Sequence, residues 1–379
     1  MAERAPRILV LVGPATGGIG AHAAALSAGI AARGATVAVV CPRLTAERFV
    51  WGVPVVLAWP GSGAVEAWRR WRRLRSLVAT ADVVHAHGHQ AGLLALAAAR
   101  GTRPRPAVVV SWHNAVLATG ARRAASALAE RLQARRADLV TGASLDLVER
   151  AAGLGAKGAE LAPVASPRAG ERVPDGARSR IRAELGLDER ALVVLTVSRI
   201  APQKRLDVLL DAAALLADDP AAARRVGAPV TWLVAGDGDA GLDAGLRARA
   251  ARSGADVRFL GARPDVPELL AAADLFVLTS RWEARALVVQ EAMAAGVPVV
   301  VTAVGGLPEL VADAGLLVRE GDAPGLATAV GDLLASPARR DTLARAARRR
   351  FAALPGEEDI TRSWWTRYAR LARAARGLR

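Results

Sequence analysis

The sequence predicts an α/β protein with two Rossmann-like domains, each built on a doubly wound parallel sheet. Short β-branched runs alternate with Ala-, Leu- and Arg-rich stretches of helical character along the whole chain, which is the pattern of repeated βαβ units. Several runs are apolar on consecutive residues, as strands covered on both faces should be. With 379 residues, the chain is also too long for one ordinary hydrophobic core.

The expected elements divide into two halves. In the first half the strands are Arg7–Gly13, Thr36–Cys41, Val53–Leu57, Asp82–His87, Ala107–Trp112 and Asp138–Gly142, with helices Ala21–Arg33, Val65–Thr80 and Arg122–Arg136. In the second half the strands are Leu192–Ser198, Val230–Ala235, Val257–Leu260, Leu275–Thr279, Val297–Val301 and Gly315–Val318. We therefore expect an N-terminal domain over residues 1–165, a proline-rich linker over 166–190, a C-terminal domain over 191–355 and a final helix over 356–379.

Composition excludes several classes of protein. A hydrophobic fraction of 52% excludes a disordered or fibrous polymer. The single cysteine, Cys41, can form neither an internal disulfide nor a Cys-rich zinc site. The apolar run Ile8–Val12 is shorter than a signal-peptide core, and no apolar stretch is long enough to span a bilayer. We therefore expect a cytoplasmic protein.

Charge is the extreme feature of the composition. The chain has 51 Lys and Arg against 36 Asp and Glu, a formal net charge of +15. Such an excess predicts an anionic partner, which is nucleic acid, a membrane surface or a phosphorylated small molecule. The arginines are scattered over many helices without a helix-turn-helix, finger or RNA-binding aromatic pattern, so we do not expect nucleic acid.

One predicted helix, Val65–Val78, combines the positive charge with aromatic residues. Its apolar residues recur at helical spacing and its five arginines occupy the rest of the wheel. One interpretation is a surface helix whose apolar stripe belongs to the core. The other is docking on anionic lipid at the inner face of the plasma membrane. The residues of this membrane or acceptor surface are Trp68, Arg69, Arg70, Trp71, Arg72 and Arg73.

A glycine-rich turn follows the first strand. Gly17, Gly18 and Gly20 stand at the beginning of the next helix, where bare backbone N–H groups and the positive helix end suit a phosphate. The spacing matches neither the dinucleotide fingerprint nor the Walker loop, which disfavours both readings. The alternative is that these glycines only allow the helix to pack closely on the strand.

Three histidines, His85, His87 and His89, alternate around the carboxyl end of a strand, which is where ligands bind in open α/β sheets. They could ligate a metal, but carboxylates at ligand spacing are missing. Contact between one of these histidines and a substrate is the better interpretation. A buried histidine with satisfied hydrogen bonds is the alternative, and it suits His85 best because this residue sits deepest.

The second half carries the more specific pattern. Arg199 and Lys204 follow a strand and precede a helix, so two cations at the carboxyl end of the sheet suit a diphosphate. The turn Gly236-Asp237-Gly238 ends the next strand and is weak evidence alone. Glu283 and Glu291 lie at a strand end and in the following helix, where carboxylates can accept hydrogen bonds from sugar hydroxyls.

Taken in order, these residues resemble the large family of retaining glycosyltransferases numbered four, which has the GT-B fold. The resemblance covers nearly the whole chain, and its most specific part runs from Glu291 through Pro298 to Glu309. It implies two Rossmann-like domains that face each other across a cleft, and a terminal helix that crosses back onto the first domain. Trp364, Trp365 and Tyr368 would suit that crossing.

The resemblance also implies a function. It implies a metal-independent, retaining hexosyltransferase without a cofactor, which moves a sugar from a nucleoside diphosphate donor to a hydroxyl of a cell-envelope glycolipid or polysaccharide. The implied catalytic residues are His87 near the sugar, Arg199 and Lys204 at the diphosphate, and Glu283 at the sugar. The implied donor-binding residues are Gly17, Gly18, Gly236, Arg263, Arg285, Ala286, Leu287 and Glu291. Of these, Glu291 would hold the ribose and Arg263 would lie in the base-binding loop.

Two departures from the family pattern leave the sugar open. Ala284-Arg285-Ala286 stands where the family has a glycine or serine, an aromatic residue, and a glycine or proline, and Ala165-Ser166-Pro167 replaces an Asn-Gly turn. Two other functions share the same residues: a nucleotide-sugar epimerase of the same fold, and a non-catalytic nucleotide-sugar binding protein. Turnover separates the three hypotheses, because only a transferase needs an acceptor to release the nucleotide.

Overall fold

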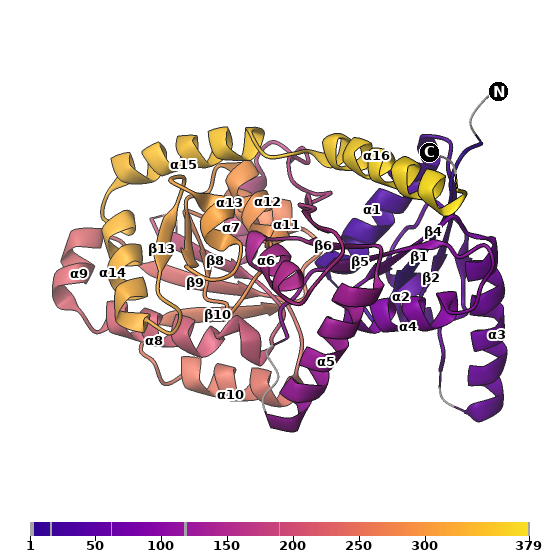
Figure 1. Ribbon diagram of the computed structural model, residues 1–379. Helices are drawn as coiled ribbons and strands as arrows, with labels where there is room; N and C mark the ends of the chain where they lie inside the picture. The colour runs from indigo at the N-terminus through magenta and orange to yellow at the C-terminus, as the bar shows by residue number, and fades with distance from the viewer. Residues whose placement is uncertain (1–3, 16, 62, 117–119, 189, 378–379) are drawn as a thin grey trace. The chain divides into compact units, whose positions relative to one another are not determined.

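The computed structural model describes residues 4–15, 17–61, 63–116, 120–188 and 190–377. Residues 1–3 of the predicted N-terminal domain, residue 189 of the predicted linker and residues 378–379 of the predicted final helix lie outside the described residues. Contacts divide the chain into two compact units. Unit 1 comprises Met1–Pro167 and Pro355–Arg379, and unit 2 comprises Arg168–Leu354. Each unit is a parallel sheet covered by helices on both faces, as predicted (Figure 1).

In its described part, unit 1 contains a seven-stranded parallel sheet in the order β3-β2-β1-β4-β5-β6-β7. The strands are β1 Arg7–Val12, β2 Thr36–Val40, β3 Val55–Val56, β4 Val83–His87, β5 Ala107–Trp112, β6 Leu139–Gly142 and β7 Ala159–Leu161. The helices are α1 Gly18–Ala32, α2 Arg43–Arg48, α3 Ala64–Thr80, α4 His89–Ala99, α5 Gly120–Arg136, α6 Leu145–Gly153 and α16 Glu357–Ala375. The strand order reverses between β1 and β4, and such a switch point forms a crevice at the carboxyl ends of the strands.

Unit 2 contains a six-stranded parallel sheet in the order β10-β9-β8-β11-β12-β13 among its described residues. The strands are β8 Leu192–Val197, β9 Val230–Ala235, β10 Asp256–Gly261, β11 Leu275–Leu278, β12 Val299–Thr302 and β13 Leu316–Val318. The helices are α7 Ala177–Glu184, η1 Pro202–Lys204, α8 Leu206–Ala217, α9 Pro220–Val226, α10 Ala240–Ala250, α11 Val266–Ala272, α12 Leu287–Ala295, α13 Leu307–Val311, α14 Ala323–Leu334 and α15 Pro337–Ala352. Its switch point lies between β8 and β11.

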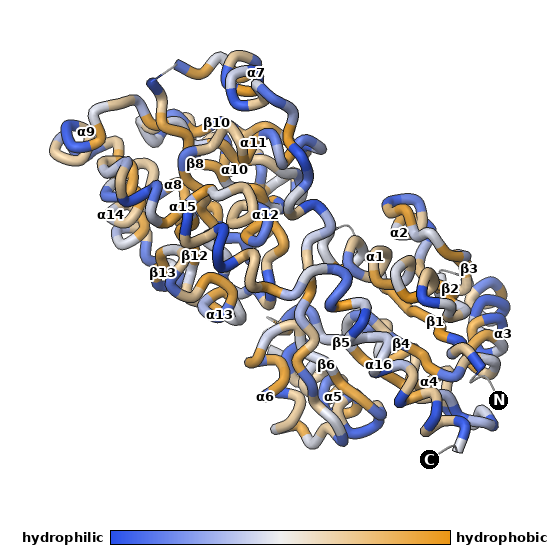
Figure 2. Tube along the Cα trace, turned by 90° about the horizontal axis from the view of Figure 1, so that it is seen from above, coloured by the Kyte–Doolittle hydropathy of each residue, from blue (hydrophilic) through white to orange (hydrophobic). Residues whose placement is uncertain are grey.

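The cores follow from the apolar runs. All six residues of β5 are buried, and strands such as β1 appear as apolar segments of the trace (Figure 2). Most predicted strands agree with the observed ones to within two residues. The prediction missed β7 and made β3 too long. Both strands are short edge strands, for which few buried residues mark the boundaries.

Three Ala-Asp dipeptides stand directly before β4, β6 and β11. Each aspartate accepts a hydrogen bond from a backbone N–H of the first or second residue of the neighbouring strand, which the sheet ladder alone would leave unpaired. The pairs are Asp82 with Arg7, Asp138 with Val108 and Asp274 with Val193, each at 2.8 Å from Oδ2 to N. These carboxylates fix where the strands begin and how they align.

Helix α16 packs on unit 1 against α1, β4 and β5 (Figure 1). The hydroxyl of Tyr368 lies 2.6 Å from Nδ1 of His85, and the Trp364 ring stacks on the same imidazole at 4.4 Å. Both aromatic side chains are 1% exposed. Near the end of the helix, Arg376 forms an ion pair with Asp82 at 2.7 Å. The aromatic residues of this helix therefore pack into the core of unit 1.

The predicted linker over 166–190 is too long. Unit 2 begins at Arg168, and α7 forms inside the predicted linker and packs on α11. Ile181 is fully buried there, and Arg178 donates to the carbonyl at the end of α11 and pairs with Asp274. The polar, arginine-rich composition of α7 hides its one apolar face in the sequence. Among all described helices, none is both long enough and apolar enough to cross a membrane.

Candidate functional site

The carboxyl ends of β8 and β11 are joined by hydrogen bonds at the switch point of unit 2. The backbone N–H of Arg281 donates to the carbonyl of Gln203 at 2.7 Å, and the Thr279 hydroxyl donates to the carbonyl of Lys204 at 2.8 Å. The turn η1 is thereby fixed against the segment that follows β11. This places the two cations and the first glutamate of the predicted site at one edge of the sheet.

Lys204 and Glu283 form an ion pair at this edge. Lys204 Nζ donates to Glu283 Oε1, which also accepts from the Ser280 hydroxyl at 2.7 Å. Each side chain of the pair is 14% exposed. Lys204 is one of two lysines in an arginine-rich chain, and an ammonium is a more compact point charge than a guanidinium. The predicted diphosphate and sugar residues are therefore direct neighbours.

Glycines set the backbone around this pair. A Cβ at Gly236 would lie 1.9 Å from the carbonyl oxygen of Ser198, and one at Gly238 would lie 2.1 Å from that of Ile200. The Gly236–Gly238 turn thus runs directly along the Arg199 loop, and only glycine permits that approach. Gly305, with a φ of +51°, is equally close to Glu283, because its Cβ would lie 2.0 Å from the Glu283 carbonyl oxygen.

Arg199 is exposed on the same loop as Lys204. The loop ends at Arg205, which has a φ of +48°, an uncommon conformation for a residue with a side chain. Bidentate bonds from the Arg205 guanidinium to Asp207 and an ion pair with Glu320 hold this turn. Strained backbone of this kind persists where surrounding contacts determine it, and it is common at functional sites.

The segment from Glu283 to Glu291 leads into helix α12. Ala286 is the residue before the helix and Leu287 its first residue, so their N–H groups lie at the positive end of the helix. Arg285 is largely buried, and burial lowers the pKa of its guanidinium. Its Nε has no hydrogen-bond partner among the described residues. Glu291 is 5% exposed and forms an ion pair with Arg168 at 3.7 Å.

Arg263 takes part in a network of ion pairs. Its guanidinium binds Asp265 through Nε at 2.8 Å and Glu184 of α7 through Nη1 at 2.8 Å. Hydrogen bonds to the Asp265 and Glu184 carboxylates raise the pKa of Arg263. The side chain thus links α7 to the β10–α11 loop. Its contact with a nucleotide base stays a prediction.

In unit 1 the glycine-rich turn has two roles. Gly17 stands before α1 and Gly18 begins it; both are exposed, and the position of a Cβ on Gly17 is open. A Cβ on Gly20 would lie 2.2 Å from the Phe49 ring, so Gly20 serves close packing. The Thr45 hydroxyl accepts from the Ala15 N–H at 3.1 Å and fixes the loop after β1.

All five histidines of the chain lie in unit 1, at the carboxyl edge of its sheet. His87 Nδ1 lies 3.0 Å from His113 Nε2, and the His22 ring lies 5.9 Å from His87 and 5.8 Å from His113. His85 bonds Tyr368 and the Ser111 hydroxyl, as expected of a satisfied buried histidine. His89 lies beside this group, at the start of α4.

Burial keeps this histidine cluster neutral. It lowers the pKa of His22 to about 4 and of His113 to about 3, and it holds the pKa values of His85 and His87 well below 6.5. The described residues contain no group of three or more His, Cys, Asp or Glu suited to a metal ion. His87 is enclosed at 3% exposure, so its contact with a sugar stays a prediction.

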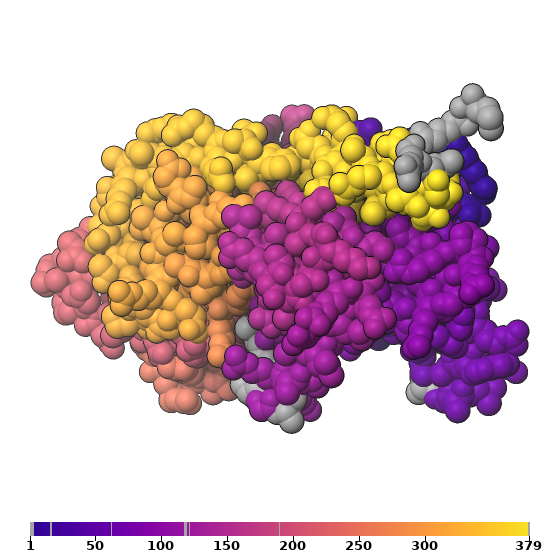
Figure 3. Space-filling view, viewed as in Figure 1, coloured from indigo at the N-terminus to yellow at the C-terminus, as the bar shows by residue number. Residues whose placement is uncertain are grey.

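Helix α3 lies at the surface of unit 1 (Figure 3). Leu74 and Val78 are buried and Trp71 is half-buried, so the second half of the apolar stripe belongs to the core. Val65 and Trp68 are 65% and 56% exposed. The Arg72 guanidinium lies over the Trp68 ring at 4.9 Å. The second half of the apolar stripe therefore belongs to the core, and docking of the exposed first half on lipid stays a prediction.

Arg70 differs from the other arginines of α3. Its Nε donates to Glu66 at 2.7 Å and its Nη1 donates to the carbonyl of Trp59 at 3.4 Å. Arg69, Arg72 and Arg73 are exposed. Arg70 therefore joins the helix to the preceding loop instead of extending the exposed basic surface.

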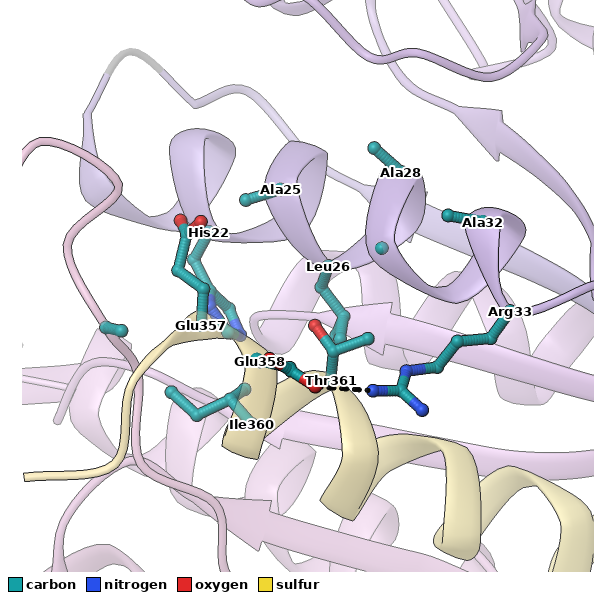
Figure 4. Close-up of a pocket in the computed structure, with 12 residues that line it drawn as sticks. His22, Ala25, Leu26, Ala28, Ala32, Arg33, Glu357, Glu358, Ile360 and Thr361 are labelled. Carbon is teal, nitrogen blue, oxygen red and sulfur yellow. Dashed lines mark ion pairs between the residues drawn. The ribbon is translucent and has the colours of Figure 1, made fainter.

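A separate hollow of about 560 Å³ lies in unit 1 between α1 and the start of α16 (Figure 4). Small residues of α1, such as Ala25 and Gly29, form one wall, and Ile360 and Thr361 of α16 form another. An ion pair between Arg33 and Glu358 at 3.5 Å spans one end. None of its lining residues is a predicted site residue.

Sequence reasoning missed several residues that shape the two edges. Ser280 bonds Glu283, Arg168 pairs with Glu291, and His22 and His113 complete the histidine cluster. Each comes from an element distant in sequence from its partner or lies in a segment without a recognised motif. Ser280 alone had a local signal, because it follows the end of β11 directly.

Two parallel α/β units, the second with a cation–carboxylate pair at its switch point, define a protein of the GT-B glycosyltransferase class. Residues 177–350 match the family described as glycosyl transferases group 1, and residues 17–167 match the glycosyl transferase 4-like domain. The chain therefore belongs to the group 1 glycosyl transferase family.

Two similar curated proteins share a name. The D-inositol 3-phosphate glycosyltransferase of Geodermatophilus obscurus is 40% identical over 201 residues, which are 50% of this chain and 43% of that protein. The protein of the same name from Thermomonospora curvata is 36% identical over 290 residues, which are 74% of this chain and 64% of that protein. The chain thus spans less than two thirds of the length of these relatives.

Solved structures share the fold. Anabaena HepE in complex with UDP has a TM-score of 0.80 and is 22% identical, with 96% of this chain and 100% of that chain covered. WaaG, a glycosyltransferase involved in lipopolysaccharide biosynthesis, has a TM-score of 0.73 and is 20% identical, with 95% and 99% covered.

Proposed function

We propose that this protein is a retaining glycosyltransferase that moves a sugar from a nucleoside diphosphate donor to a hydroxyl group without a metal ion. The observation that carries the proposal is the Lys204–Glu283 pair at the β8/β11 switch point, with the exposed Arg199 on the same loop. A cation that already lies against a carboxylate suits a ligand with both a phosphate and a sugar. Family membership supports the same activity.

The proposed chemistry uses fixed charges in place of a protein base. As the bond from the sugar carbon to the phosphate oxygen breaks, negative charge grows on the diphosphate, where Arg199, Lys204 and the α12 N–H groups stabilise it. The departing phosphate oxygen takes the proton of the acceptor hydroxyl, whose oxygen bonds the sugar carbon on the same face. Glu283 would hold the sugar and Glu291 the ribose.

Unit 1 supplies the other proposed contacts. Gly17 and Gly18 are exposed and would direct backbone N–H groups to the diphosphate, and His87 would contribute a neutral imidazole at the sugar. A neutral group there leaves the charge of the leaving diphosphate to the cations of unit 2. The exposed part of α3, Val65, Trp68, Arg69, Arg72 and Arg73, is the proposed docking surface for an anionic membrane that carries a lipid-linked acceptor.

The names of similar proteins support a nucleotide donor and a polyol acceptor. The relatives above are named for inositol 3-phosphate, and HepE structures contain UDP or UDP-glucose. These ligands belong to those proteins, and they provide the first probes for this one.

The test is binding followed by turnover. Thermal-shift measurements with UDP, GDP, ADP and their sugars should identify one nucleotide that stabilises the protein. Release of that nucleotide from its sugar only when an acceptor such as inositol 3-phosphate or a methyl glycoside is present supports transfer, and unchanged release with EDTA supports a metal-free reaction. Release of a free epimer would instead indicate an epimerase. Binding without any turnover would indicate a binding protein.

A further inference from the structure

Trp59 lies at the carboxyl end of β1, at the switch point of unit 1. A Cβ on Gly13, the residue that follows β1, would lie 3.4 Å from Cη2 and 3.6 Å from Cζ2 of the Trp59 indole. The same Cβ would lie 3.8 Å from Oε1 of Gln90, in the first turn of α4. One aromatic ring and one amide therefore border the same space, which Gly13 leaves without a side chain.

The loop that carries Trp59 is held in place by α3. Arg70 donates to the Trp59 carbonyl, and its Nη1 would lie 3.2 Å from a Cβ on Gly61, so the guanidinium also fits closely against the next turn of the loop. The ion pair with Glu66 fixes the guanidinium in turn. Trp59 is half-buried and Gln90 is exposed, so both residues remain partly accessible to a ligand.

This combination of groups suits a polyol ring. A pyranose or cyclitol ring has an apolar face of C–H groups that packs on an indole, and a rim of hydroxyls that bond to an amide, which both donates and accepts. A nucleobase also stacks on aromatic rings. However, the side chains proposed to bind the donor's diphosphate and ribose, Lys204 and Glu291, belong to unit 2. A ring bound at Trp59 of unit 1 is therefore better assigned to the acceptor.

We infer that Trp59 and Gln90 form an acceptor subsite for a polyol ring, with Arg70 as a positioning residue for Trp59. The inference rests on the proposed function and names the substrate class that the unit 1 edge selects. It also assigns different roles to the two tryptophans Trp59 and Trp68, since Trp68 belongs to the outer face of α3.

The experiment compares Trp59→Ala, Trp59→Phe, Gln90→Ala and Arg70→Met with the control Leu128→Ala, a change of an exposed apolar residue on α5 of unit 1 that belongs to no proposed site. Saturation-transfer NMR with myo-inositol and with methyl α-D-glucopyranoside reports binding of the ring in the absence of a donor. Steady-state assays report kcat and KM for the acceptor, and nucleotide release in water reports the donor side.

Trp59→Ala should raise KM for the polyol about tenfold and abolish the NMR signal of the ring protons, with nucleotide affinity and donor hydrolysis unchanged. Trp59→Phe should restore most of the binding, because an aromatic face remains. Gln90→Ala and Arg70→Met should raise KM less and leave kcat nearly constant, and Leu128→Ala should match the wild type. Far-UV circular dichroism confirms that each variant folds.

Three outcomes overturn the inference: equal effects of Trp59→Ala and Leu128→Ala, a loss of nucleotide affinity in Trp59→Ala, or no binding of either polyol by the wild type. Failure of the proposed function looks different. If Trp59 controls polyol binding but the wild type transfers no sugar to any acceptor, the subsite stands and the activity is wrong. If transfer is normal in Trp59→Ala, the activity stands and the subsite is wrong.

Discussion

The two units have the same kind of sheet and a switch point of the same topology, yet the chemistry at the two edges is opposite. In unit 2 an ion pair, Lys204–Glu283, lies beside an exposed arginine and a helix N-terminus. In unit 1 four imidazoles lie there, three of them buried and that of His113 half-buried, and loss of hydration keeps them neutral. The fold fixes where a ligand binds in each unit, but the side chains decide which part of a ligand each unit can bind.

The difference has a physical reason. Charges that must meet a diphosphate need partial exposure, because a fully buried ion pair loses more hydration than it gains from Coulomb attraction. The neutral imidazoles have no such requirement, and they are packed against Trp364, Tyr368 and one another. The charged edge is therefore sensitive to loss of a single charge, while the neutral edge is sensitive to pH.

The largest effect is expected from the charged edge. Lys204→Ala and Glu283→Ala should each lower kcat for sugar transfer by about 100- to 1000-fold, because each removes a charged group that we propose to contact the reacting donor. The control is Lys157→Ala, which removes the other lysine of the chain from an exposed position in unit 1. Activity near the wild-type value in both site variants would show that the site is misassigned.

The next largest effect is expected on stability, at two aspartates that have equivalent positions in the two units. Asp82 is 6% exposed in its side chain and pairs with Arg7 and Arg376, and hydrogen bonds from these arginines hold its pKa below the usual range although burial acts in the opposite direction. Asp82→Asn should lower the free energy of unfolding of unit 1 by roughly 2–4 kcal/mol. Urea denaturation followed by tryptophan fluorescence measures this.

The matched variant is Asp274→Asn in unit 2. Asp274 makes the same bond to a strand N–H but is 13% exposed and pairs with Arg178 and Arg182. We expect a smaller loss of stability, because no terminal helix depends on it. A loss equal to that of Asp82→Asn would contradict the role assigned to the contact between α16 and Asp82.

The third prediction concerns pH. The buried histidines have lower pKa values in the folded state than in the unfolded state, so they stabilise the fold above about pH 6.5 and the unfolded chain takes up protons below it. The free energy of unfolding of unit 1 should fall by up to about 1.4 kcal/mol per pH unit for each such histidine between pH 6.5 and the folded pKa, which is about 4 for His22.

Hydrogen exchange measured at pH 7.5, 6.5 and 5.5 follows the two units separately. Unit 2 contains no histidine in the sequence and should keep its protection over this range. His113→Gln should reduce the dependence of the unfolding free energy of unit 1 on pH, because one histidine with a lowered pKa is removed. Equal pH dependence in the two units would contradict the assignment.

The smallest effect is expected at the surface of α3. Arg72→Ser should weaken cosedimentation with anionic vesicles about fivefold, from a loss of about 1 kcal/mol, and added salt should weaken binding of the wild type as well. Arg345→Ser on α15 is the control, because that helix is also rich in exposed arginine. No vesicle binding by the wild type, or equal effects of the two changes, would exclude the proposed membrane surface.

The fold and part of the candidate site of unit 2 were predictable, because apolar runs and local motifs can be recognised in the sequence. The strands, the Lys204 loop and the two glutamates of unit 2 lie where the sequence places them. The position of Trp59 against Gly13 was not predictable, because it depends on how the loop after β3 folds back over β1. Arg263 shows the same limit: its partner Glu184 lies on α7, inside the segment taken for a linker.

Unit 1 is assembled from both ends of the chain, and this determines the order of folding during synthesis. The ribosome completes residues 168–354 before it makes α16, so unit 2 can fold while unit 1 still lacks Ile360, Trp364 and Tyr368 of its core. Until then His85 lacks its tyrosine partner, and the core residues of unit 1 that pack on these three side chains lack those contacts. At this stage unit 2 can be complete while unit 1 still exposes apolar surface, which is the kind of surface that chaperones bind.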